Sequence, residues 1–167
     1  VETPDPLMGA EAATKADLDE VIRSVWQGLG YNDRKRLGSV YTTINVVDKI
    51  LDEVGYNGRS KDIIVDPACG AGAFVIVAAE RKFKQSKQKN INERIKEVFS
   101  CVIGADISAE PGRVCRTLLR ALILHWTALI NKEPELDFEL LESVHPIVLK
   151  VNSWKDDLKN EIHNALP

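Results

Sequence analysis

A glycine-rich turn between a predicted strand and a predicted helix is the part of this sequence most suited to chemistry. This glycine turn, residues 66–74, has the sequence Asp-Pro-Ala-Cys-Gly-Ala-Gly-Ala-Phe. The apolar, β-branched residues 63–65 before it predict a strand that is buried on both faces, as in a parallel sheet. Gly70 and Gly72 permit a tight turn and let a ligand approach the bare backbone. Strand, turn and helix together predict the first half of a nucleotide-type binding unit.

The acid at the start of the glycine turn narrows the class of ligand. A dinucleotide would place its pyrophosphate over this turn, where a carboxylate at Asp66 would repel it. The third glycine of the dinucleotide fingerprint is also absent. A ligand with an ammonium group and ribose hydroxyls, but no phosphate, suits the turn better, and S-adenosylmethionine is such a ligand. The alternative is a glycine-rich turn that binds nothing.

A second predicted strand, residues 101–105, ends at Asp106. In nucleotide-binding units the acid at this position accepts hydrogen bonds from ribose hydroxyls. Asp106 is farther from the glycine turn than the roughly 20 residues typical of dinucleotide folds, and a lysine-rich insert accounts for the excess. Alternatively, Asp106 is a helix cap or a surface acid, because Ser108, Glu110 and Pro111 are typical of the start of a helix.

A third predicted strand, residues 147–151, is followed directly by Asn152. Ligands of open α/β sheets bind outside the carboxyl ends of the strands, so Asn152 is expected on the same rim as Asp66 and Asp106. Its alternative interpretation is a turn residue after a strand.

Amphipathic patterns predict helices before and between these strands. Residues 14–29 predict an amino-terminal helix, and residues 113–130 a long apolar one. A further helix begins at Thr42 or Thr43, either of which can cap it, and ends at Gly55. One apolar stripe is predicted on this helix, made of Val46, Val47, Ile50, Leu51 and Val54.

The helix after the glycine turn ends in a basic run, for which two interpretations remain. Its cations could contact phosphates. The favoured interpretation is the solvated end of a helix, where positive charge also suits the dipole. The run consists of Arg81, Lys82, Lys84, Lys87 and Lys89.

The length and bulk composition indicate one domain and exclude several classes of protein. The 167 residues suffice for a core, and the net charge of −3 is not typical of a nucleic-acid binder. Three cysteines without metal-ligand spacing predict reduced thiols in a cytoplasmic protein. We expect no membrane partner, because no apolar run is long enough to span a bilayer and no signal peptide precedes the first helix.

Three blocks, in order, resemble the amino-terminal part of a bacterial adenine-N6 DNA methyltransferase of restriction–modification systems. Residues 38–42, Gly-Ser-Val-Tyr-Thr, resemble the block that contacts the methionine part of the cofactor, with Thr43 in place of the usual proline. The glycine turn resembles the family's Asp-Pro-Ala-Cys-Gly-Ser-Gly-Ala-Phe block, with Ala71 in place of serine. Residues 104–107 resemble the block whose acid holds the ribose and whose next apolar residue packs on the adenine.

The resemblance implies a class I, Rossmann-like methyltransferase fold of the α/β class. It implies a helical amino-terminal segment over residues 1–37 and the cofactor-binding part of a methyltransferase domain over residues 38–167. Asn152 matches loosely the position where the family has an Asp or Asn near the adenine amino group. The implied S-adenosylmethionine site comprises Tyr41, Thr42, Asp66, Ala68, Gly70, Gly72, Phe74, Asp106, Ile107 and Asn152.

The family's catalytic motif, Asn or Asp followed by Pro-Pro and an aromatic residue, does not occur, since the sequence has no Pro-Pro pair. That motif binds the target amine and stacks on a flipped-out base. We therefore expect a truncated domain that is inactive alone, with DNA bound by other parts of a parent protein. The residues specify no oligomeric state. The alternatives are a fragment of an RNA or protein-glutamine methyltransferase, and a non-catalytic binding or assembly module.

Overall fold

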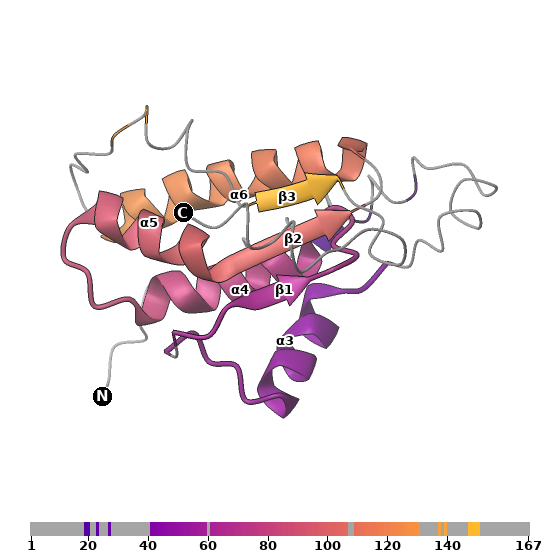
Figure 1. Ribbon diagram of the computed structural model, residues 1–167, viewed down its shortest axis with the longest axis horizontal. Helices are drawn as coiled ribbons and strands as arrows, with labels where there is room; N and C mark the ends of the chain where they lie inside the picture. Colours follow the sequence, from indigo (N-terminus) through magenta and orange to yellow (C-terminus); the bar gives the residue numbers. More distant parts are fainter. Residues whose placement is uncertain are drawn as a thin grey trace, which may run out of the picture.

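A three-stranded parallel sheet with helices packed around it forms the described part of the chain. The computed structural model describes residues 19–20, 23, 27, 41–59, 61–106, 109–130, 137, 139 and 147–150. The sheet has the order β1-β2-β3, with β1 at Ile64–Asp66, β2 at Val102–Asp106 and β3 at Ile147–Lys150. The helices are α3 at Ile44–Glu53, α4 at Ala73–Gln85, α5 at Ile91–Cys101 and α6 at Ala109–Ile130 (Figure 1).

The register ends β1 two residues short of the end of β2, whereas β2 and β3 end side by side. Asp66 pairs with Gly104, and Asp106 pairs with Lys150. Helices α4 and α6 lie behind the sheet in Figure 1 and contact each other, while α3 packs against α4. This arrangement confirms the predicted α/β class.

Where the predicted elements fall within the described residues they are present, with small shifts at their ends. Cys101 belongs to α5 instead of β2, and α6 begins four residues before the predicted start. Of the predicted amino-terminal helix, the structure describes Asp19, Glu20, Arg23 and Gln27, all of them helical. None of the helices in the described ranges is both long enough and apolar enough to cross a membrane.

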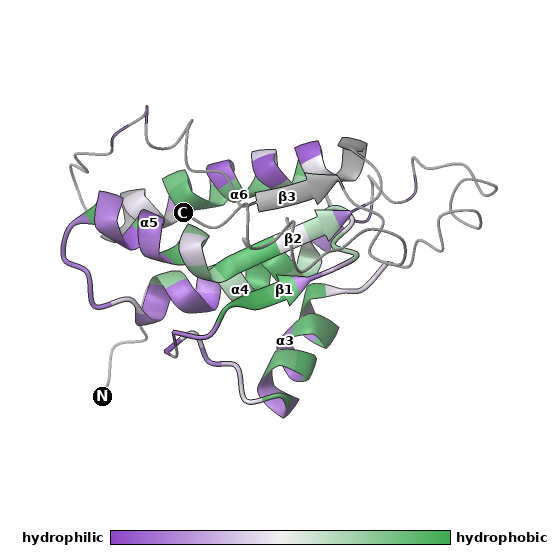
Figure 2. Ribbon diagram, viewed as in Figure 1, coloured by the Kyte–Doolittle hydropathy of each residue, from purple (hydrophilic) through white to green (hydrophobic). Residues whose placement is uncertain are grey.

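Helix α4 is the centre of the core. It is buried along nearly its whole length because the sheet, α3, α5 and α6 all contact it. Figure 2 shows the hydrophobic residues gathered where β1, β2 and α4 meet, with hydrophilic residues on the outer sides of α5 and α6. The apolar core residues of α4 are Ala73, Val75, Ile76, Val77, Ala78, Ala79 and Phe83.

Strand β1 is not buried on both faces, contrary to the prediction. All three of its residues are only partly buried, and Ile63 just before it exposes 46% of its surface. β1 lies at the edge of the described sheet and pairs there with β2. An apolar β-branched run therefore predicted the strand correctly but not its surroundings.

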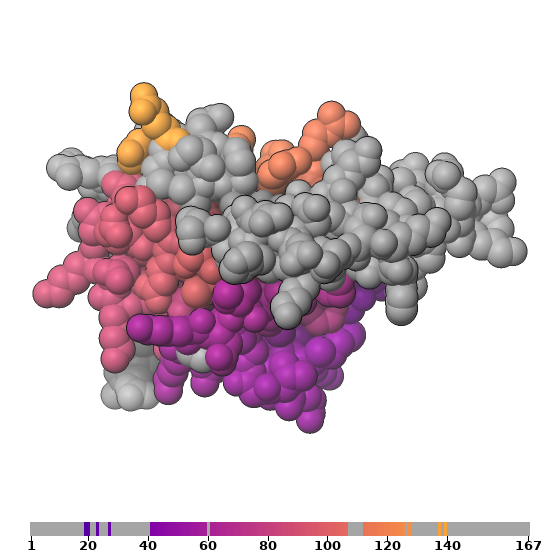
Figure 3. Space-filling model, viewed as in Figure 1, coloured from indigo at the N-terminus to yellow at the C-terminus, as the bar shows by residue number. Residues whose placement is uncertain are grey.

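Helix α3 has two apolar rows instead of the one stripe predicted. Ile44, Val47 and Leu51 are buried, whereas Val46, Ile50 and Val54 are 46%, 40% and 69% exposed. Residues three or four apart lie on one side of a helix, so each row forms a separate line. Only the line of Ile44, Val47 and Leu51 faces the core. In the space-filling view, α3 lies at the lower edge of the molecule (Figure 3).

The carboxyl end of α3 follows the prediction. Gly55 has a φ of 74°. Its amide donates to the carbonyl of Asp52, and the amide of Tyr56 donates to the carbonyl of Leu51. These are the two hydrogen bonds of a glycine-terminated helix, and they direct the chain back toward α4.

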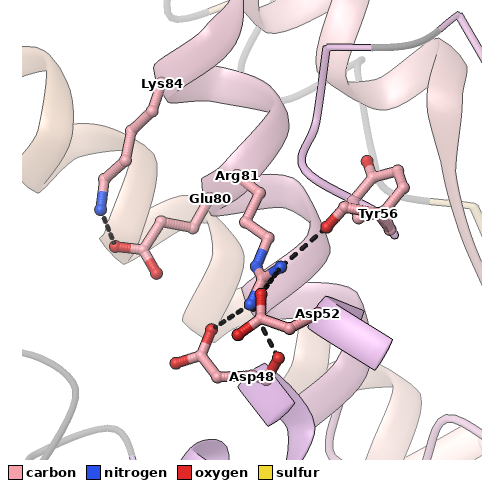
Figure 4. Close-up of polar contacts among 6 residues, drawn as sticks. All are labelled: Asp48, Asp52, Tyr56, Glu80, Arg81 and Lys84. Atoms are coloured by element: carbon pink, nitrogen blue, oxygen red, sulfur yellow. Dashed lines mark hydrogen bonds and ion pairs between the residues drawn. The ribbon is translucent and has the colours of Figure 1, made fainter. Parts of the chain in front are cut away.

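Arg81 links α4 to α3 through hydrogen bonds, so the prediction that it lies at the solvated end of a helix is wrong. Its guanidinium donates to Asp52 Oδ1 at 2.7 Å, to Asp48 Oδ1 at 2.9 Å, and to the carbonyls of Tyr56 and Asp48 at 2.7 and 2.8 Å (Figure 4). The Arg81 side chain is 17% exposed. A planar group with five donors suits this set of acceptors, and lysine could not reproduce it.

Lys82 also departs from the predicted solvated end. Its side chain is 2% exposed, and its Nζ lies 3.1 Å from Glu97 Oε1. Ser86 donates to the other oxygen of Glu97 at 2.6 Å, and this hydrogen bond, with Lys82, lowers the pKa of Glu97. Lys84, Lys87 and Lys89 are exposed as predicted, although Lys84 pairs with Glu80 at 2.7 Å.

We predict that Arg81→Met destabilises the chain by roughly 2–3 kcal/mol, because it removes the hydrogen bonds of a largely buried guanidinium to two carbonyls, to the shielded carboxylate of Asp48 and to the more exposed carboxylate of Asp52. Urea denaturation measures this cost. Lys96→Met is the control, since Lys96 and Glu93 are about half exposed and such pairs contribute about 0.2–1 kcal/mol. Equal costs for the two variants would show that Arg81 does not hold α3 in place.

Candidate functional site

The glycine turn is hydrogen-bonded to the end of β2. The amide of Gly70 donates to Asp106 Oδ2 at 2.9 Å, and the amide of Cys69 donates to the carbonyl of Ala105 at 2.9 Å. The sequence predicted that the turn and Asp106 share the carboxyl edge of the sheet. The structure joins them directly.

Asp66 adds a second carboxylate to this edge. Its Oδ1 accepts a hydrogen bond from the amide of Ala68 at 3.2 Å. Burial raises the pKa of Asp66 and the nearby charge of Asp106 raises it further, whereas the Ala68 amide acts in the opposite direction. Two acids brought together in this way favour a ligand that carries positive charge.

The two glycines of the turn have different surroundings. Gly70 has a φ of 53°, and a Cβ added there would meet no atom within 4 Å in the described part of the chain, its two sequence neighbours aside. Gly72 has a φ of 97°, and a Cβ there would clash with the Sγ of Cys115 on α6. Gly70 therefore leaves its backbone open to a ligand, while Gly72 allows the turn to pack on α6.

A third glycine, Gly104 in β2, has a role that the sequence analysis missed. A Cβ at Gly104 would lie 3.0 Å from Cys69 Sγ and 3.0 Å from Val75 Cγ2. Its missing side chain lets the glycine turn and α4 approach the sheet closely. Glycine inside a strand often indicates such an approach, so the sequence did contain this signal.

Cys69 is a packing residue of the turn. It and Cys115 are both buried. The adjacent thiol of Cys115 and burial together raise the pKa of Cys69, which keeps its sulfur protonated. A protonated thiol is neither a nucleophile nor a metal ligand. Within the described ranges, no three side chains from His, Cys, Asp or Glu come together as a possible metal site.

Tyr41 and Thr42 immediately precede α3. Tyr41 is partly buried against the core, and its hydroxyl donates to the carbonyl of Asp19 at 3.0 Å. Thr43 occupies the N-cap position of α3, but its side chain makes no capping hydrogen bond there. The amide of Ile44 donates instead to Asp19 Oδ1 at 2.8 Å. The predicted threonine cap is therefore wrong, and a residue 25 positions earlier supplies the acceptor.

The other predicted site residues divide into two groups. Phe74 lies in the first turn of α4, partly buried against the core. Ile107 and Asn152 fall outside the described residues, so their roles remain predictions.

Comparisons with known proteins agree with the sequence blocks. A family model described as N-6 DNA Methylase matches residues 18–129, more than half of the chain. Over 68 residues the chain is 35% identical to the type II restriction enzyme and methyltransferase RM.BcgI of Heyndrickxia coagulans. This match covers 41% of the chain but 10% of that relative. No solved structure matches the chain.

We predict unequal costs for alanine at the two glycines of the turn. Gly70→Ala should destabilise the chain by about 1–2 kcal/mol, the cost of a left-handed conformation for a residue with a side chain. Gly72→Ala should cost about 1–3 kcal/mol more, because its methyl group also clashes with Cys115. Urea denaturation of both variants tests the assignment. A cost for Gly70→Ala as large as that for Gly72→Ala would contradict the open space at Gly70.

We predict that Asp66→Asn stabilises the chain without ligand at neutral pH. The raised pKa of Asp66 means that the folded state disfavours the ionised carboxyl, so stability falls as the pH rises from the ordinary value of 3.8 through the folded value. Asparagine keeps the acceptor for the Ala68 amide and removes the charge.

The melting temperature of Asp66→Asn should therefore exceed that of the wild type at about pH 7, and the gain should shrink as the pH falls toward about 4. Asp62→Asn, at an exposed acid four residues earlier, is the control. A gain that is independent of pH, or one shared by the control, would rule out the charge of Asp66 as its cause.

Proposed function

Because this chain belongs to the N-6 DNA methylase family, we propose that it is the S-adenosylmethionine-binding part of a DNA adenine-N6 methyltransferase of a restriction–modification system. The partial identity with RM.BcgI, a protein named as both a restriction enzyme and a methyltransferase, supports the assignment to such a system. The parallel order β1-β2-β3 with crossover helices supports a Rossmann-like class I fold. The two parts proposed remain a helical segment over residues 1–37 and the cofactor-binding part over residues 38–167.

The observation that carries the proposal is the open side of Gly70 next to two acids. Apart from its two chain neighbours, a Cβ at Gly70 would meet no atom of the described residues within 4 Å. The amide of the same residue donates to Asp106, and Asp66 lies close enough for the charge of Asp106 to raise the pKa of Asp66. A cofactor with a positive charge and ribose hydroxyls, but no phosphate, suits this combination of bare backbone and carboxylates.

Asp106 is proposed to accept hydrogen bonds from the ribose hydroxyls. An ionised carboxylate has about four acceptor positions, so holding Gly70 is compatible with binding hydroxyls. Asp66 is proposed to favour the positively charged methionine part and to repel a pyrophosphate. Tyr41, Thr42, Ala68, Gly72 and Phe74 complete the proposed binding surface, together with Ile107 and Asn152.

When bound, S-adenosylmethionine supplies a methyl group activated by the positive sulfonium. The residues of this chain bind and orient it, which is the part of the catalysis that comes from proximity and alignment. The sequence has no Pro-Pro pair, so we assign none of its residues to the target amine. We propose that DNA is bound by other parts of the whole protein. The family description favours DNA over RNA or a protein side chain as the substrate.

We predict that the chain binds S-adenosylmethionine and discriminates against NAD, as measured by isothermal titration calorimetry. Asp106→Ala should weaken S-adenosylmethionine binding by about 1.5–3 kcal/mol, the value of a hydrogen bond to a charged group. Asp106→Asn should lose less, because its side-chain oxygen can still accept from Gly70. Gly70→Ala should also reduce the affinity, since its methyl group enters the proposed binding space.

The comparison between the two ligands tests whether Asp66 and Asp106 select S-adenosylmethionine. Equal affinity for NAD and S-adenosylmethionine would contradict the role of the two acids. Unchanged affinity in Asp106→Ala, with wild-type binding measured alongside, would place the ribose hydroxyls elsewhere.

A further inference from the structure

Helix α3 receives its N-terminal cap from a distant part of the chain. The first amides of a helix usually find an acceptor in the side chain of the N-cap residue. At α3 the N-cap residue is Thr43, whose side chain makes no such bond, and the Ile44 amide donates to Asp19 Oδ1 at 2.8 Å. The Asp19 side chain is 20% exposed, so this bond is largely shielded from water.

The same residue also holds Tyr41. The Tyr41 hydroxyl donates to the backbone carbonyl of Asp19 at 3.0 Å. Arg23, one helical turn later, pairs with Asp19 Oδ2 at 3.3 Å, and its guanidinium stands over the Tyr41 ring at 5.6 Å from the ring centre. Burial is the main cause that raises the pKa of Tyr41, so its hydroxyl stays a neutral donor near pH 7.

Asp19 therefore accepts hydrogen bonds from both ends of the short segment from Tyr41 to Ile44. One of its oxygens fixes the start of α3, its carbonyl fixes the aromatic side chain, and Thr42 lies between these two points. Fixing the backbone of one residue costs about 1–2 kcal/mol. If the segment is already ordered before a ligand binds, the free energy of binding does not include the entropy cost of ordering it.

We propose that Asp19 is a positioning residue of the cofactor site, which orders Tyr41 and Thr42 for the methionine part of S-adenosylmethionine. This inference rests on the proposed function. It assigns a role in cofactor affinity to a residue that lies within the range matched by the family model but outside the three short sequence blocks.

The test measures S-adenosylmethionine affinity of the 167-residue chain by calorimetry, well below the melting temperature of each variant. Asp19→Ala removes the carboxylate that accepts from the Ile44 amide but keeps the backbone carbonyl to which Tyr41 donates, so binding should weaken about tenfold, the equivalent of fixing about one residue. Asp19→Asn keeps the acceptor for the Ile44 amide and should stay within about threefold of the wild type. Glu20→Ala, at the exposed neighbouring position, is the matched control and should change nothing.

A second ligand separates positioning from a general loosening of the fold. 5′-Methylthioadenosine has the nucleoside of the cofactor but lacks its amino acid, and competition against labelled S-adenosylmethionine measures its affinity. Asp19→Ala should weaken S-adenosylmethionine more than 5′-methylthioadenosine. Equal losses for both ligands, or no loss for either, would overturn the inference while leaving the proposed function intact. A wild-type chain that binds no S-adenosylmethionine would overturn the proposed function, and the inference with it.

Discussion

The hydrogen bond from the Gly70 amide to the Asp106 carboxylate is the interaction on which the site depends. Asp106 ends β2 and Gly70 belongs to the turn after β1, so the bond fixes the turn across two neighbouring strands. The amide of Cys69 and the carbonyl of Ala105 add a second bond beside it. A carboxylate that accepts from a backbone amide makes a stronger bond than a neutral acceptor would. One acid thus shapes the turn and, in the proposed function, also contacts the ligand.

The sheet edge shows a conflict between stability and binding. Burial is the main cost of ionising Asp66, and the nearby negative charge of Asp106 adds to that cost. Nothing in the packing of the core requires an acid at Asp66, because its hydrogen bond to the Ala68 amide needs only an oxygen. An unfavourable charge in an unliganded protein is common where a ligand of opposite charge binds. Other acids of the structure do have basic partners: Arg81 pairs with acids of α3, and Lys82 pairs with an acid of α5. The unfavourable negative charge is therefore confined to the sheet edge.

Much of this architecture follows from local sequence, and the exceptions have physical reasons. The β-branched run, the glycines and the acid after the second strand predicted β1, the turn, α4 and β2. The sequence did not separate Gly70 from Gly72, because the difference lies in Cys115, which comes from another element. It did not identify Asp19 as the cap of α3, or Arg81 as a link between helices, since both bonds join distant residues. Periodicity predicted apolar residues on α3, but which of them are buried depends on how α4 packs against it.

The parallel pairing of β1 and β2 also determines when, during folding, the glycine turn takes its final shape. Asp66 pairs with Gly104 only after the chain has passed through both α4 and α5. Pairings between residues so far apart form slowly, because a long stretch of chain must first be closed, whereas the bonds of a helix are local. Gly70 can meet Asp106 only when β2 has joined β1. A partly folded chain with helices alone would have no site, so a ligand of this turn would act on the finished fold and stabilise it without guiding its formation.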